Sequence, residues 1–152
     1  MPGSSGTFKT DLEAVFTSNP GSEAEAADGI AEAIAKYFMG VKIGNLAKPA
    51  LPATKDAIKA AALTSLSGMN ATGAFAGKLS AAILSGGNAA KADATAAATV
   101  TGIVGTPPTY SLSSPSDNSS TIAQSIVTAT DAALASWTGT NVSSGATVTG
   151  WK

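Results

Sequence analysis

The sequence predicts a mainly α-helical protein, built from five or six short helices packed as an irregular bundle. Apolar side chains recur at the three- and four-residue spacing of a helix face through most of the chain. Serine or threonine stands before these stretches and glycine after them, as in the caps of helices. Alanine supplies much of the apolar content, and aromatic residues make up only 5% of the 152 residues. Short extended segments are expected after residue 40 and after residue 139.

The chain is expected to divide into a leader, one helical domain and a tail. Residues 1–6 should form a flexible leader, and they have neither the basic start nor the apolar run of a signal peptide. Residues 7–138 make up the helical domain, and residues 139–152 form a tail rich in threonine, serine and glycine. The first helix should be capped near Thr7, and its apolar face is formed by Phe8, Leu12, Val15 and Phe16.

The clearest helix is expected from Ser22 to Met39. Ser22 can cap it, and acidic residues follow in its first turn, near the positive end of the helix dipole. Gly40 should end it. Its apolar stripe consists of Ile30, Ile34, Tyr37 and Phe38. Residues 41–44 alternate between apolar and polar or glycine, which favours a short strand or an extended exit.

Two more helices are expected in the middle of the chain. Residues 44–53 contain two prolines and predict a connector. Thr54 should cap a helix that runs to about Leu66. The next helix is expected from Thr72 to Leu84, and its apolar residues Phe75, Leu79 and Ile83 lie four apart. Residues 85–88, Ser-Gly-Gly-Asn, should end it.

The last third is expected to hold an alanine-rich helix, a connector and a final long helix. Residues 89–99 favour a helix on propensity alone, and Val100, Ile103 and Val104 lie at its far end. Residues 105–118 contain three prolines and predict a connector. Ser119 or Ser120 should cap a helix that runs to about Trp137, and the tail after it favours a loose hairpin or an edge strand. The inner face of this helix is formed by Ile122, Ile126, Ala129, Ala133, Leu134 and Trp137.

Charged residues are sparse and unevenly distributed. They make up 12% of the chain, against about 25% in typical soluble domains, and all nine cations are lysine. Counted from the sequence, residues 1–40 carry a net charge of −4, residues 41–93 of +4, and residues 94–152 of −1. This asymmetry is either chance or an acidic face that meets the basic face of the next copy, head to tail.

The residue types argue against catalysis. The chain has no histidine and no cysteine, which excludes Ser–His–Asp and Cys–His sites and the commonest metal ligands. Glu25 with Asp28, and Asp28 with Glu32, form carboxylate pairs one helical turn apart, but acids near a helix start usually interact with the helix dipole. No phosphate-binding loop or EF-hand loop is present. We therefore expect no enzyme activity and no cofactor.

The expected partners are other proteins. Scattered lysines without arginine make a poor footprint for nucleic acid, so no specific nucleic acid is expected. No apolar run is long enough to span a membrane, so no membrane association is expected. Trp137 lies on an apolar helix face, where the core is its default place, and Trp151 is either disordered or an anchor in a neighbour. The candidate interface residues are Phe8, Phe16, Glu25, Glu32, Trp137 and Trp151.

Three stretches carry a resemblance to a class of viral proteins. They are the opening Phe8-Lys9-x-Asp11-Leu12, the helix from Asp28 to Tyr37 (DGIAEAIAKY), and the run from Phe75 to Ile83 (FAGKLSAAI). Over residues 1–85 and the helix around Ile122, the chain resembles small alanine-rich virion structural proteins of tailed bacteriophages, especially contractile-tailed ones.

The resemblance implies a non-enzymatic subunit at the head–tail neck or in the tail or baseplate. Such a subunit is made in the host cytoplasm, resides in the virion as a homo-oligomer, and contacts copies of itself and other virion proteins. The alternatives are a capsid decoration protein, a small enzyme or ligand-binding domain, and an adhesin-like module. The charge-poor, Ser/Thr-rich C-terminal third permits the last of these.

Overall fold

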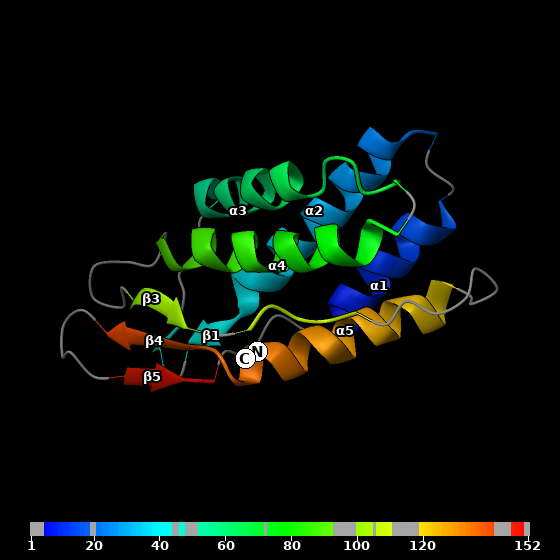
Figure 1. Cartoon of the computed structure of the whole chain (residues 1–152). Coiled ribbons are helices and arrows are strands. Elements are labelled where there is room, and N and C mark those ends of the chain that lie inside the picture. Colours follow the sequence, from blue (N-terminus) through cyan, green and yellow to red (C-terminus); the bar gives the residue numbers. More distant parts are fainter. Residues whose placement is uncertain are drawn as a thin grey trace.

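The computed structural model shows a mainly helical protein, as the sequence predicts (Figure 1). It describes residues 5–18, 21–43, 46–47, 52–71, 73–92, 100–104, 106–110, 119–141 and 147–150. The five helices in these residues are α1 (Ser5–Thr17), α2 (Glu23–Gly40), α3 (Pro52–Ser65), α4 (Phe75–Ala92) and α5 (Ser119–Ala135). Residues 5 and 6, which the sequence assigns to the leader, are the first residues of α1, so that predicted boundary is corrected.

Two small antiparallel sheets complete the described part of the chain. The first pairs β1 (Lys42–Ile43) with β2 (Leu46–Ala47). The second has the order β3-β4-β5, from β3 (Val100–Val104), β4 (Thr138–Asn141) and β5 (Thr147–Thr149), and it lies beside the C-terminal end of α4 (Figure 1). The extended segments predicted after residue 40 and after residue 139 are confirmed, and the predicted hairpin of the tail is β4–β5. Because β4 also pairs with β3, the tail forms a sheet with residues from the middle of the chain.

Helix α2 is the centre of the bundle. It packs against α1, α3 and α4, while α1 also packs against α5. Eight of its 18 residues are buried, and they form one broad face of the helix that is wider than a narrow apolar stripe. This pattern is expected of a helix enclosed by others. The predicted stripe residues Ile30, Ile34, Tyr37 and Phe38 are all among the buried eight.

The start of α2 is capped as the sequence predicts. The backbone N–H of Glu25 donates to the Ser22 hydroxyl over 3.2 Å. In return, the Glu25 carboxylate accepts from the backbone N–H of Gly21 over 2.9 Å. These reciprocal bonds satisfy backbone donors that the first turn of a helix leaves free. The helix ends at Gly40, just beyond the predicted last residue Met39, and Val41 is its C-cap.

The predicted break at residues 85–88 is wrong, because α4 continues through them to Ala92. Glycine normally costs a helix interior about 1 kcal/mol relative to alanine. Here, the two glycines allow close packing: a Cβ at Gly87 would lie 2.5 Å from Trp137 Cζ3, and one at Gly86 would lie 3.1 Å from Ile34 Cγ2. The glycines therefore mark a close contact between helices, and the tertiary contact outweighs the local propensity.

Residues 100–104 form strand β3 rather than the end of an alanine-rich helix. Valine, threonine and isoleucine favour strands, and β4 provides a partner for them. The helical prediction for residues 89–92 is confirmed as part of α4, and residues 93–99 lie outside the described residues.

Candidate functional site

Two of the predicted interface residues lie in the core of the single chain. Phe8 is 1% exposed and stacks on Tyr37, with ring centroids 4.6 Å apart. Trp137 is 0% exposed and stacks on Phe38, with centroids 6.4 Å apart. The interface assignment of Phe8 and Trp137 is therefore corrected: their helical spacing reflects the packing of this chain with itself.

The other two aromatic candidates differ from these. Phe16 is half-buried and packs edge-on against Phe75, with centroids 6.4 Å apart. Most of its contact area is thus already used within the chain. Trp151 lies outside the described residues, so neither of its two expected states, disordered or an anchor in a neighbour, is tested.

The acidic candidates on α2 are bound within the chain. Glu32 forms ion pairs with Lys55 and with Lys59, the latter at 3.4 Å, and Asp28 pairs with Lys59 at 3.1 Å. The hydrogen bond from Lys55 is the main cause that lowers the pKa of Glu32, and Lys59 adds to it. The same pairing raises the pKa of Lys59, chiefly through its bond with Asp28. The acidic and basic regions of the sequence therefore meet between α2 and α3 of one chain.

The remaining acids of α2 bind backbone amides. The Glu23 carboxylate accepts from the N–H of Gly68 over 2.9 Å and of Asn70 over 3.3 Å, and so holds the turn after α3. Glu25 caps the start of α2, as described above. The intermolecular docking expected for Glu25 and Glu32 is thus not needed to explain the uneven charge. Their carboxylates are engaged in structural contacts rather than arranged around a cleft.

The outer face of α5 lacks the charged side chains that α2 and α3 carry. Its exposed residues are uncharged and, apart from Gln124, short: Ser120, Thr121, Gln124, Ser125, Thr128, Ala132 and Ala135. The single charged residue of the helix is Asp131. It points inward, where it accepts 2.6 Å hydrogen bonds from the hydroxyls of Ser5 and Tyr37. The whole outer face of α5 is therefore free of charge.

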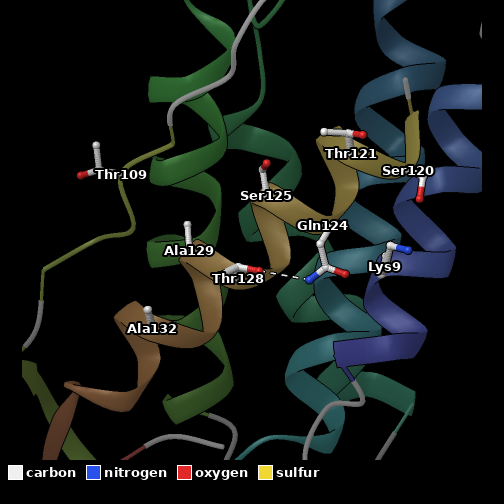
Figure 2. Close-up of a pocket in the computed structure, with 9 residues that line it drawn as sticks. All are labelled: Lys9, Thr109, Ser120, Thr121, Gln124, Ser125, Thr128, Ala129 and Ala132. Atoms are coloured by element: carbon white, nitrogen blue, oxygen red, sulfur yellow. Dashed lines mark hydrogen bonds between the residues drawn. The ribbon is translucent and has the colours of Figure 1, made fainter. Parts of the chain in front are cut away.

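A groove of about 670 Å³ lies along this face. Figure 2 shows α5 crossing it, with Lys9 of α1 on one side and Thr109 of an extended segment on the other. The Gln124 amide donates to the Thr128 hydroxyl over 3.0 Å along its floor (Figure 2). Apart from Gln124 and Lys9, the lining is made of hydroxyls and methyl groups, which can donate, accept and pack at close range.

Two buried aromatic side chains fix the segment that carries Thr109. The indole N–H of Trp137 donates to the backbone oxygen of Thr106 over 3.0 Å. The Tyr110 hydroxyl lies 2.7 Å from the Thr130 hydroxyl of α5, and burial raises the pKa of Tyr110. The groove wall is thus held at both of its ends by contacts with the core.

Charge enters the groove at one edge only. Lys9 pairs with Glu13 on α1 at 3.1 Å, one helical turn away. A hydrogen bond from Ser120 and the pairing with Lys9 both lower the pKa of Glu13. The ammonium group of Lys9 is therefore partly neutralised by its neighbour, and the rest of the groove is polar without charge.

The described residues contain neither a metal-binding cluster nor a membrane-spanning helix. No group of three or more His, Cys, Asp or Glu side chains in them could hold a metal ion. None of the helices in this part of the chain is long and apolar enough to cross a bilayer. The outer face of α5 was not among the sites predicted from the sequence. Its polar residues lie between the predicted inner-face residues, so this face could have been predicted from the same helical spacing.

Comparisons of the chain with protein-family models, with curated proteins and with solved structures find no match.

Proposed function

We propose that this chain is a non-enzymatic structural subunit of a tailed-bacteriophage particle, at the head–tail neck or in the tail or baseplate. It acts by packing the outer face of α5 against a helix of a neighbouring subunit. The observation that carries the proposal is the uncharged outer face of α5 together with the groove beside it. The resemblance of the sequence to virion structural proteins supports the choice of particle.

The physical reason is the low cost of covering this face. Protein surfaces usually carry charged side chains, and the buried centres of interfaces are depleted of them. A charged residue must lose its hydration when a partner covers it, whereas a short hydroxyl or methyl group loses little. Short side chains also have little rotamer entropy to lose, and they let a second helix approach closely.

The experiment compares two alanine-to-lysine substitutions at exposed helix positions. Ala132→Lys places a charge in the groove on α5, while Ala57→Lys places one on the exposed face of α3. Each tagged variant is produced in the infected host, and its incorporation is measured in purified particles by gold labelling. We expect the Ala57→Lys chain to appear at one fixed position of the particle. The Ala132→Lys chain should be depleted by at least about tenfold, as for a buried, unpaired charge.

Two outcomes would contradict the proposal. One is the absence of the native chain from all particles. The other is equal incorporation of both variants, which would leave the α5 face without a role in assembly. If the native chain instead binds a small molecule in the groove, and Ala132→Lys abolishes that binding, the ligand-binding alternative replaces the proposal.

A further inference from the structure

The outer edge of β5 has no partner strand among the described residues. Strand β5 is the last member of the β3-β4-β5 sheet, and it pairs with β4 along one edge only, through Thr147↔Thr140, Val148↔Gly139 and Thr149↔Thr138 (Figure 1). Such an edge presents backbone N–H and C=O groups that can bind another strand.

Sheet edges in native proteins usually carry a device that prevents such pairing. Lysine, proline, bulges and covering helices are the common ones. The opposite edge of this sheet has two of them, because β3 has a register shift between Thr101 and Val104 and packs against α4. Strand β5, with the sequence Thr-Val-Thr, carries neither a charge nor a proline. Among the described residues, the remaining protection of this edge is the shortness of the strand.

The end of β5 is fixed to the helical bundle. The N–H of Gly150 donates to the backbone oxygen of Trp137 over 3.0 Å, which extends the β4–β5 ladder by one pair. Gly150 has a φ of +78°, a value that favours glycine. The edge of β5 is therefore held in place by a buried residue of the core.

We infer that the outer edge of β5 pairs with the same edge of a second copy, antiparallel across a two-fold axis. The partner is a second copy because Thr147–Val148–Thr149 reads the same in both directions. In antiparallel pairing centred on Val148, the threonines of one copy lie opposite the threonines of the other, and threonine pairs are favourable across strands. The two paired strands bring no like charges together, because β5 carries no charged residue. The product is a six-stranded sheet, and larger sheets are more stable than small ones.

The pairing is expected to be weak for isolated chains. Three residues provide few hydrogen bonds, so the dimer should form at high concentration or where a particle holds the copies close together. The inference rests on the proposed function because the particle is what holds the copies close together. It concerns a different surface, however, because β5 contributes nothing to the groove of α5.

The test uses the absence of cysteine from the chain. Thr147 is exposed, and Thr147→Cys introduces the single thiol of the protein. In the proposed dimer, the two residues at position 147 are offset by two positions across the axis, so their Cα atoms lie about 8 Å apart. A short bis-maleimide should therefore link two copies at high concentration. The matched control is Thr10→Cys, an exposed threonine on α1.

We expect Thr147→Cys to give at least about five times more covalent dimer than Thr10→Cys. Adding Thr149→Lys to Thr147→Cys should return the yield to that of the control, since like charges then stand at the shared edge. Thr149→Ser should keep the yield, and circular dichroism shows whether each variant is folded. Equal cross-linking of Thr147→Cys and Thr10→Cys, or a folded Thr149→Lys variant with undiminished yield, would overturn the inference.

Failure of this inference can be told apart from failure of the proposed function. If Thr147→Cys does not cross-link but Ala132→Lys is still depleted from particles, the β5 pairing is wrong and the proposed function stands. If Thr147→Cys cross-links and both lysine variants enter particles equally, the pairing is supported and the role of α5 is wrong.

Discussion

At the scale of single residues, Gly87 lies where no other side chain fits. A Cβ there would meet Trp137 Cζ3 at 2.5 Å and Cη2 at 3.1 Å, and Trp137 is fixed between Phe38 and the backbone of Thr106. Gly77, in the same helix, has no atom within 4 Å of its would-be Cβ. The two glycines thus provide a matched pair.

We expect Gly87→Ala to destabilise the protein and Gly77→Ala to stabilise it. Overpacking at Gly87 should cost about 1–3 kcal/mol, which exceeds the gain in helix propensity. At Gly77 only the propensity gain remains, at most about 1 kcal/mol. Urea denaturation of both variants measures the difference. If Gly87→Ala were as stable as Gly77→Ala, the close contact with Trp137 would be wrong.

The two tyrosines of the chain make stability depend on alkaline pH. Burial raises the pKa of Tyr37, and the hydrogen bond to Asp131 adds to that effect. Burial also raises the pKa of Tyr110, while its bond with Thr130 opposes this in part. Tyrosines in the unfolded chain ionise near pH 10, whereas these two stay protonated in the folded chain.

The contribution of the two tyrosines to stability should therefore be constant below about pH 10 and fall above it, because the unfolded state alone then releases their protons. Each tyrosine should lower the unfolding free energy by about 1.4 kcal/mol per pH unit in that range. Absorbance at 295 nm and circular dichroism, followed together, should show tyrosine ionisation and unfolding in one transition. Tyrosinate that forms near pH 10 in a folded chain would contradict the burial of both hydroxyls.

At the scale of elements, the ion pairs between α2 and α3 carry the charge asymmetry of the sequence. Glu32 and Lys55 are each about one third exposed, with side-chain exposures of 27% and 35%. Because surface pairs contribute about 0–1 kcal/mol each, their effect on stability should be small. Because each ion pair joins a particular residue of α2 to a particular residue of α3, the pairs also set how the two helices are aligned.

We expect a double-mutant cycle of Glu32→Gln and Lys55→Gln to give a coupling of at most about 1 kcal/mol, reduced in 1 M salt. The pKa of Glu32 is lowered in the folded chain, so this stabilisation is present above the usual glutamate range and is lost as the pH falls through it. Thermal unfolding measures the cycle. Zero coupling together with loss of assembly would favour the head-to-tail contact instead.

The elements also show what could be predicted from sequence. Helices α2 and α5 were predicted within two residues of their observed ends, because caps and apolar spacing agree there. The predicted end of α4 failed, because Gly86 and Gly87 were interpreted by local propensity while their role is a contact with distant Phe38 and Trp137. The helical prediction for residues 100–104 failed for the same reason, since β4, the strand that pairs with them, lies more than thirty residues later.

The candidate site was predictable in part. The outer face of α5 follows from the helix and its predicted inner face, so its lack of charge was present in the sequence. The second wall of the groove was not predictable, because Thr109 is placed by contacts of Tyr110 and Trp137 that join distant parts of the chain. Phe8 and Trp137 are wrong as candidate interface residues, because an apolar helix face does not reveal which chain covers it; the core, the default place expected for Trp137, is where both lie.

At the scale of the whole molecule, a central helix organises a core rich in alanine. Helix α2 contributes four buried alanines, which let its neighbours approach closely but bury little surface each. The uncharged face of α5 and the edge of β5 lie outside this core. The central claim is that these surfaces are covered in an assembly, and that the charges on α2 serve the fold of one chain.

Sedimentation equilibrium over a wide range of protein concentration tests that claim most directly. We expect a mass above the 14.7 kDa of one chain that rises with concentration. Ala132→Lys should lower that mass, while Ala57→Lys should leave it unchanged. A native chain that stays at 14.7 kDa at every concentration, with both variants identical to it, would contradict the account.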